Sequence, residues 1–313
     1  MTRYRKLNKE EAGAKSSDST NLLSAPEAQI KDYISLLKPR VMSLVVFTAS
    51  VGIYLAPGEI NPFVAFIAIL CISFASGASG AINMWYERDL DLLMNRTKNR
   101  PIPGKRMLPQ SAIEFAVVTA FISVFVMSLA VNFVAGVLLL CAILFYVFIY
   151  TVWLKRRTPQ NIVIGGAAGA LPPVIGWACV TGSVTWESIA LFLIIFLWTP
   201  PHFWALALYK NEDYTRAGIP MLPVVSGLKE TRKQILIYSV ILLLASLWPV
   251  GLGMFGATYG VGAIILGLIF LYLACKLYIE YKEELARKTF KYSLLYLALL
   301  FSLMVVDNII QKL

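Results

Sequence analysis

Residues 63–82, FVAFIAILCISFASGASGAI, lead without a break into residues 83–103, NMWYERDLDLLMNRTKNRPIP. The first stretch contains no charged residue, and about 20 apolar residues are enough for a helix to cross a lipid bilayer. The second stretch carries acidic residues and then a group of Arg and Lys residues. Together the two stretches predict a transmembrane helix with a charged site at one end.

The whole chain has the composition of a polytopic membrane protein. Of its 313 residues, 58% are hydrophobic and 15% are charged, whereas about 25% of a typical soluble domain is charged. We expect an all-α fold with nine transmembrane helices, because lipid offers no partner for open backbone groups. The predicted spans are 41–57, 62–85, 111–130, 132–152, 161–180, 187–208, 235–254, 258–278 and 292–311.

The basic residues lie on one side of the predicted membrane. All but one of the 28 Lys and Arg residues precede the first span or follow spans two, four, six and eight. The other links between spans contain none. The positive-inside rule therefore predicts a cytoplasmic N-terminus and a C-terminus outside. The net charge of +10 is mainly a signal of topology, so we expect no nucleic-acid partner.

Residues 1–30 are polar and lack the apolar core of a secretory signal. We expect a disordered cytoplasmic tail here and a single transmembrane domain at 31–313. Transit peptides contain few acids, so Glu10, Glu11 and Asp18 favour a bacterial inner membrane. The mitochondrial inner membrane is the alternative.

Asn83, Glu87 and Asp91 are spaced four residues apart, which places them on one face of a helix and Asp89 on the other. Acids at a helix C-terminus oppose the helix dipole, so capping explains them poorly. Oxygen ligands suit Mg²⁺, which typically takes one or two protein carboxylates together with substrate phosphates. We therefore predict a Mg²⁺ site on this face.

Basic side chains follow this acidic group, and a guanidinium can bind phosphate oxygens in a bidentate manner. Arg96 and Arg100 are the first candidates for binding a diphosphate. The sequence YTVWLKRRTPQN at residues 150–161 adds Lys155 and Arg156, although a Tyr followed by basic residues also suits ordinary membrane anchoring.

A second charged group follows the sixth predicted span, ALYKNEDYTRAGIPMLP at residues 207–223. Asp213 is its most plausible ligand, and Lys210 lies about one turn before it. The segment RAGIPMLP echoes RPIPGKRMLP at residues 100–109, after the first group. The two groups suggest an internal repeat whose halves form opposite walls of one cation site.

With these motifs in place, the chain resembles the UbiA-type intramembrane prenyltransferases, and within them the branch that farnesylates haem. The resemblance covers nearly the whole chain from Lys31. It rests on SLLKPRVM, NMWYERDLDLLMNRTKNRPIP, YTVWLKRRTPQNIVIGGAAGALPPVIGW, TPPHFWALAL and DYTRAGIPMLPVV.

The two acidic motifs of this family match the chain unequally. Its first motif, Asn-x-x-x-Asp-x-x-x-Asp, corresponds to Asn83, Glu87 and Asp91, with Glu in place of the first Asp. Its second motif has two Asp residues four apart, whereas that register holds Lys210 and Tyr214 here. Lys210 is therefore expected to contact the diphosphate directly.

The resemblance implies nine helices around a central cavity and a Mg²⁺-dependent reaction. Farnesyl diphosphate, haem B and water would give haem O and diphosphate. Haem-copper terminal oxidases use such haems, so haem A synthase or oxidase assembly proteins are candidate partners, with membrane lipid as the surroundings. The implied metal ligands are Asn83, Glu87, Asp91 and Asp213, and with Lys210 they form the catalytic set. The implied diphosphate ligands are Arg96, Arg100, Lys155 and Arg156.

The haem site is less defined. His202 is the only histidine and lies in LWTPPHFWALAL, where Pro200 and Pro201 predict an interruption of the helix. A haem contact, a proton carrier and a plain hydrogen bond to a neighbouring helix are all open for His202. Tyr150 is the second candidate haem contact.

Two other classes of function fit parts of the pattern. A prenyltransferase acting on an aromatic or quinone precursor, such as 4-hydroxybenzoate, would share the metal site and differ in the acceptor pocket. A transporter of an anionic metabolite would carry its ionisable residues near the membrane midplane, whereas most of them lie at one surface here. A structural assembly factor for oxidases would not need the array that begins at Asn83.

Overall fold

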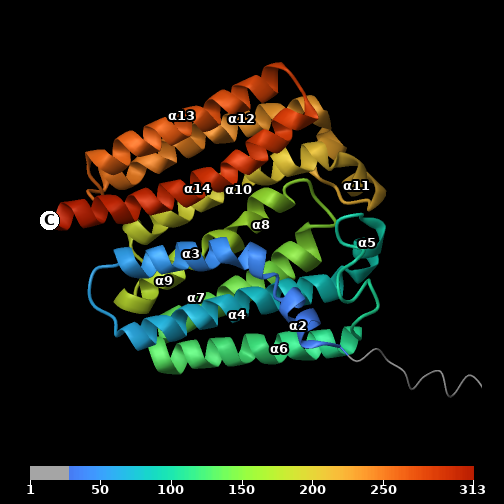
Figure 1. Ribbon diagram of the computed structural model, residues 1–313, viewed down its shortest axis with the longest axis horizontal. Helices are drawn as coiled ribbons and strands as arrows, with labels where there is room; N and C mark the ends of the chain where they lie inside the picture. Colours follow the sequence, from blue (N-terminus) through green and yellow to red (C-terminus); the bar gives the residue numbers. More distant parts are fainter. Residues whose placement is uncertain (1–27) are drawn as a thin grey trace, which may run out of the picture.

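The computed structural model describes residues 28–313, so nearly all of the predicted tail at residues 1–30 lies outside the described residues. In the described part of the chain the regular structure is entirely helical, and the long helices lie side by side along one direction (Figure 1). The helices are α2 (Ile30–Leu36), α3 (Pro39–Leu55), α4 (Pro62–Tyr86), α5 (Arg88–Leu93), α6 (Pro109–Val126), η2 (Met127–Val131), α7 (Phe133–Leu144), η3 (Phe145–Leu154), α8 (Asn161–Ala170), α9 (Pro172–Thr181), α10 (Trp186–Tyr209), α11 (Asn211–Arg216), α12 (Leu222–Gly251), α13 (Ala257–Ile279) and α14 (Glu283–Lys312).

The described part of the chain contains eight to nine candidate spans, in agreement with the nine predicted. Within residues 28–313, eight segments are long and apolar enough to cross a membrane, and the bent pair α2–α3 makes a ninth. This first span differs from its prediction, because it starts with α2 and bends by 53° before α3. Hydropathy marks the lipid-facing part of a span, so the polar helix α2 was missed.

Several spans depart from a regular α-helix. Spans three and four contain the π-helical segments η2 and η3, and span five divides at Leu171 into α8 and α9. In contrast, α10 continues as one helix through Pro200 and Pro201, so the predicted interruption of this span is wrong. Packing of α10 against its neighbours, especially α12, α14 and α8, holds the helix together where the proline nitrogens cannot donate.

Small residues allow a close helix approach between α3 and α9. A Cβ atom on Gly52 would overlap the backbone of Pro173, and one on Gly176 would overlap the backbone of Ala49. Because lipid tails are as apolar as side chains, membrane helices associate through such close packing. The glycines therefore join the first span to the fifth.

The charged segments gather at one end of the bundle. Figure 1 shows α5 and α11 at the right-hand end and α2 in the right-hand half, whereas α14 reaches the C-terminus at the left-hand end. Large apolar side chains remain exposed along the sides, for example Phe121 (69%) on α6 and Ile265 (54%) on α13, as a lipid-facing surface requires. The helical bundle thus has one polar end and apolar lipid-facing sides.

We predict that Gly176→Ala lowers the free energy of unfolding by about 1–3 kcal/mol, because the new methyl group meets an immovable backbone. The matched control is Gly169→Ala, whose Cβ would meet nothing within 4 Å. That control should be neutral or stabilising by up to about 1 kcal/mol, because alanine favours the helix over glycine. Thermal unfolding in detergent measures both, and equal melting temperatures would refute the close-packing argument.

Candidate active site

The α4–α5 junction carries the first predicted group. The α4 helix ends at Tyr86, and Glu87 adopts φ −98° and ψ 14° before α5 begins. The i to i+4 bonding continues across this break, because Glu87 N–H donates to Asn83 O at 3.0 Å and Asp91 N–H donates to Glu87 O at 2.9 Å. Asn83, Glu87 and Asp91 are all buried while Asp89 is exposed, as their spacing predicts.

Each buried acid of this group has a basic partner from a different segment. Lys155 donates to Glu87, and one guanidinium nitrogen of Arg100 donates to both Asp91 oxygens, at 2.8 and 3.0 Å. A buried carboxylate needs such a partner, because removing a charge from water is costly. Two of the predicted diphosphate ligands are therefore bound to predicted metal ligands in this structure.

Asn83 is oriented by Thr151 of η3. The Asn83 side-chain nitrogen donates to Thr151 Oγ1 at 3.2 Å, which leaves the amide oxygen for another partner. In addition, Glu87 Oε1 is buried and has no hydrogen-bond partner among residues 28–313. Both oxygens are the type of ligand that Mg²⁺ prefers.

The second predicted group sits at a similar helix junction. The α10 helix ends at Tyr209, Lys210 occupies the break, and α11 carries the buried Asp213. The side-chain nitrogen of Asn95 donates to Asp213 Oδ1 at 3.4 Å, so the loop after α5 reaches the second group. Arg216 also pairs with Asp213, at 3.7 Å. Glu87 and Lys210 thus occupy similar breaks, each between a long helix and a short one.

The predicted metal ligands fit a hard cation by their chemistry but do not form a cage. In the described part of the chain, no three His, Cys, Asp or Glu side chains gather closely enough to hold a metal. The available donors are carboxylate and amide oxygens, including the unpartnered Glu87 Oε1. Such a set suits Mg²⁺ shared with substrate phosphates, because Mg²⁺ keeps few protein ligands in these sites.

The remaining predicted diphosphate ligands differ in their partners. Arg96 is exposed and makes no ion pair within residues 28–313. Arg156 instead donates to both oxygens of Asp89, at 2.8 and 3.0 Å, and also to the Tyr86 carbonyl. Burial raises the pKa of Asp89, but the hydrogen bond and charge of Arg156 together with backbone hydrogen bonds outweigh this effect and hold the pKa below its ordinary value. Asp89 therefore stays ionised and is paired with Arg156.

Lys210 lies at the edge of the second group. Its Nζ atom lies 5.9 Å from the centre of the Tyr209 ring, and no carboxylate in the described residues pairs with it. Its ammonium group is therefore available to an anionic ligand.

The two candidate haem contacts have different surroundings. Tyr150 borders the charged group, because Lys155 Nζ lies 5.6 Å from its ring centre and Gly165 makes room for its ring. His202 is instead buried between α10 and α14, where Nδ1 lies 2.6 Å from Ser293 Oγ. Its ring stacks on Trp198 and Phe290, with centroid distances of 4.3 and 4.6 Å.

Sequence reasoning missed four residues of this region. They are Lys38, Asn95, Tyr146 and Thr151. Lys38 had the clearest signal, because it is the one charged residue among the four and lies in the quoted segment SLLKPRVM. The others are uncharged residues whose importance depends on a neighbour from another helix.

Comparisons with known proteins place the chain in a family. The sequence model of the UbiA prenyltransferase family matches residues 45–300 of this chain. The chain belongs to this family. Its relatives include the protoheme IX farnesyltransferase of Rhodopseudomonas palustris (strain BisB5), which is 54% identical over 292 residues and covers 91% of this chain and 93% of the relative. The protoheme IX farnesyltransferase of Rickettsia bellii is 53% identical over 283 residues, with 90% and 94% covered.

Solved structures support the same fold. A structure of digeranylgeranylglyceryl phosphate synthase aligns with a TM-score of 0.76 at 20% identity and covers 91% of this chain and 99% of that chain. A UbiA homolog from Archaeoglobus fulgidus bound to DMAPP and Mg²⁺ aligns with a TM-score of 0.67 at 18% identity, with 88% and 99% covered. At these identities the likeness concerns the fold alone.

We predict that Lys155→Met lowers the free energy of unfolding by about 3–5 kcal/mol, because it leaves the buried Glu87 carboxylate unpaired. The double variant Lys155→Met/Glu87→Gln should recover most of that loss, since the two residues are coupled. The matched control is Arg156→Met, which breaks the more exposed pair with Asp89 and should cost about 1 kcal/mol or less. Thermal unfolding in detergent with EDTA measures all three, and an equal loss in both single variants would contradict the assignment.

Proposed function

We propose that this chain transfers the farnesyl group of farnesyl diphosphate to a vinyl group of haem B, giving haem O and diphosphate. The observation that carries the proposal is its 53–54% identity to protoheme IX farnesyltransferases over about nine tenths of both chains. The charged group at one end of an apolar bundle supports it, because a prenyl diphosphate has a charged head and an apolar tail.

The proposed reaction makes one carbon–carbon bond. The C1–O bond of farnesyl diphosphate breaks, and its electron pair stays on the diphosphate oxygen. The π electrons of the haem vinyl group form the new bond to C1, and water adds to the resulting cation and releases a proton. The iron is neither oxidised nor reduced, so the protein needs no redox group.

The role of the chain is to stabilise the departing diphosphate and keep water away from the farnesyl cation. Asn83, Glu87, Asp91 and Asp213 would hold Mg²⁺, which supplies positive charge to the leaving group when bound. The basic side chains Arg96, Arg100, Lys155, Arg156 and Lys210 would donate to its oxygens. Such fixed positive groups act most strongly in a site with little water.

Exchange of partners explains how the paired residues can take part. In this structure Lys155 and Arg100 neutralise Glu87 and Asp91. A magnesium diphosphate brings both signs of charge, so the carboxylates can pair with the cation while Lys155 and Arg100 pair with phosphate. No buried charge is left uncompensated during the exchange.

The acceptor is the main point on which a second function could differ. An enzyme prenylating an aromatic precursor such as 4-hydroxybenzoate would use the same charged group. The identity to farnesyltransferases of protoheme IX favours haem as the acceptor. Tyr150 beside the charged group is the better placed of the two candidate haem contacts, because His202 is engaged by Ser293.

We further propose that the site opens to the cytoplasm of a bacterial inner membrane. The charged segments gather at the end of the bundle where the basic loops lie, which supports a cytoplasmic site and a C-terminus outside. Haem A synthase or a terminal oxidase assembly would then receive the product.

The direct test incubates the purified protein with haem B, farnesyl diphosphate and Mg²⁺ and chromatographs the extracted haems. We expect a haem with one added farnesyl group and one added water, and none when EDTA is present. A parallel reaction with 4-hydroxybenzoate should give no product. Prenylation of 4-hydroxybenzoate without any change in haem would reject haem as the acceptor.

We predict that Asp91→Asn lowers kcat by at least about 100-fold, because removing a preorganised charged group from such a site costs roughly 3 kcal/mol or more. The matched control is Asp89→Asn, two residues away on the exposed face, which should keep activity within a few fold. Circular dichroism and the melting temperature check that both variants fold. Wild-type turnover by Asp91→Asn would remove this residue from the proposed metal site.

A further inference from the structure

Lys38 has an unusual backbone conformation at the bend between α2 and α3. Its φ and ψ are 52° and 56°, in the left-handed region that residues other than glycine rarely adopt. It also precedes Pro39, which disfavours helical conformations at the residue before it. Backbone strain of this kind costs about 1–3 kcal/mol and often accompanies a functional role.

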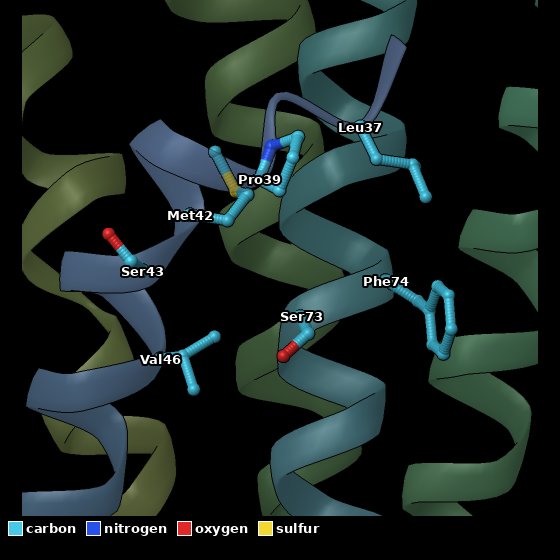
Figure 2. Close-up of a pocket in the computed structure, with 7 residues that line it drawn as sticks. All are labelled: Leu37, Pro39, Met42, Ser43, Val46, Ser73 and Phe74. Atoms are coloured by element: carbon cyan, nitrogen blue, oxygen red, sulfur yellow. The ribbon is translucent and has the colours of Figure 1, made fainter. Parts of the chain in front are cut away.

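The residues on either side of Lys38, Leu37 and Pro39, face the surface of the bundle, whereas the Lys38 amine contacts α4. Figure 2 shows Leu37 and Pro39 at a groove of about 280 Å³ that α3 forms with Ser73 and Phe74 of α4. Pro39 and Phe74 are exposed, so this groove lies on the surface of the bundle. The Lys38 amine instead donates to the Gly80 carbonyl of α4 at 3.1 Å.

Two glycines of α4 allow this arrangement. A Cβ atom on Gly77 would lie 2.8–3.0 Å from side-chain atoms of Leu37, so a larger residue would push the bend away. Gly80 lies beside the Lys38 side chain, whose Cδ and Nζ would be 3.5 and 3.6 Å from an added Cβ. The bend therefore packs directly on α4 and fixes the path of the Lys38 side chain.

This contact places the amine next to the candidate active site. Gly80 precedes Asn83 by three residues, so its carbonyl lies roughly one helical turn, about 4.5 Å, further into the bundle. Gly80, Asn83 and Glu87 follow the i, i+3, i+7 spacing of one helix face. Lys38 is also within electrostatic range of Arg100, Lys155, Asp91 and Glu87.

The Lys38 amine has no carboxylate partner in the part of the chain that the structure describes. Within residues 28–313 it forms no ion pair, and its hydrogen bond goes to a backbone carbonyl that carries no net charge. A lysine ammonium has three N–H donors, so two remain available. A partly buried lysine amine with free N–H donors, beside carboxylates that already have partners, is suited to an anionic ligand.

We propose that Lys38 is a further substrate-binding residue, whose amine donates to an oxygen of the diphosphate at its farnesyl end. This inference rests on the proposed function, since it concerns the same substrate. The amine lies deeper than Asn83, at the boundary between the charged group and the apolar interior. That is where a diphosphate with its tail in the bundle presents the oxygen that leaves from C1.

The test variant is Lys38→Gln, because a glutamine amide can still donate to the Gly80 carbonyl but carries no charge. We expect its kcat/KM for farnesyl diphosphate to fall about 10- to 150-fold, the loss of one charge-assisted hydrogen bond. The KM for haem B should not change. The matched control, Lys31→Gln, removes the same charge from an exposed position of α2 and should behave as wild type.

A binding measurement separates this inference from the proposed function. Inorganic diphosphate with Mg²⁺ should raise the melting temperature of wild type and Lys31→Gln, and raise that of Lys38→Gln much less. This result holds even if the wild type does not farnesylate haem, in which case the proposed acceptor fails and the role of Lys38 stands. If Lys38→Gln raises the KM for haem B instead and binds diphosphate normally, the anion is a haem carboxylate and our assignment is wrong.

A second variant covers the case in which Lys38→Gln does not fold. Lys38→Gly removes the amine and accommodates the left-handed backbone without strain. We expect it to fold and to show the same loss of diphosphate binding. Normal diphosphate binding by either folded variant would show that Lys38 only holds the bend against α4, and would overturn the inference.

Discussion

The balance of buried charge governs the arrangement at the polar end of this bundle. Glu87, Asp91 and Asp213 are buried where an unpaired carboxylate would be costly. Glu87 and Asp91 each pair with a base from another segment, whereas Asp213 pairs with Arg216 of its own helix and accepts a hydrogen bond from Asn95. Lys155 comes from the end of span four, Arg100 from the loop after α5, and Asn95 reaches across to the second half. These pairs connect the helix ends as well as neutralise them.

This balance is suited to a ligand that carries both signs of charge. A ligand of one sign of charge that displaced one member of a pair would leave the other member without a partner. A magnesium diphosphate offers a cation to the acids and anionic oxygens to the bases, which agrees with the function proposed for this member of the UbiA family. The similar breaks at Glu87 and Lys210 carry opposite charges, so they differ in what they can bind.

Sequence patterns predicted the parts of the site that depend on one helix. The spacing of Asn83, Glu87 and Asp91 indicated a shared face, and the structure buries all three while leaving Asp89 exposed. Patterns failed where a contact joins distant segments, as for Thr151 with Asn83. For His202 they left open the hydrogen bond to a neighbouring helix that it makes with Ser293. They also failed for α10, where prolines predicted an interruption that packing prevents. Tertiary contacts override local preference in each case.

The sequence by itself determined that this chain is a nine-span helical protein with its charges collected at helix ends. Hydrophobic length and the placement of basic residues follow directly from the cost of exposing charge or open backbone to lipid. Only the tertiary structure decided which acid pairs with which base, and where Lys38 points. Those outcomes depend on the close packing of helices far apart in the chain, which the glycines of α3, α4 and α9 permit and which no local pattern encodes.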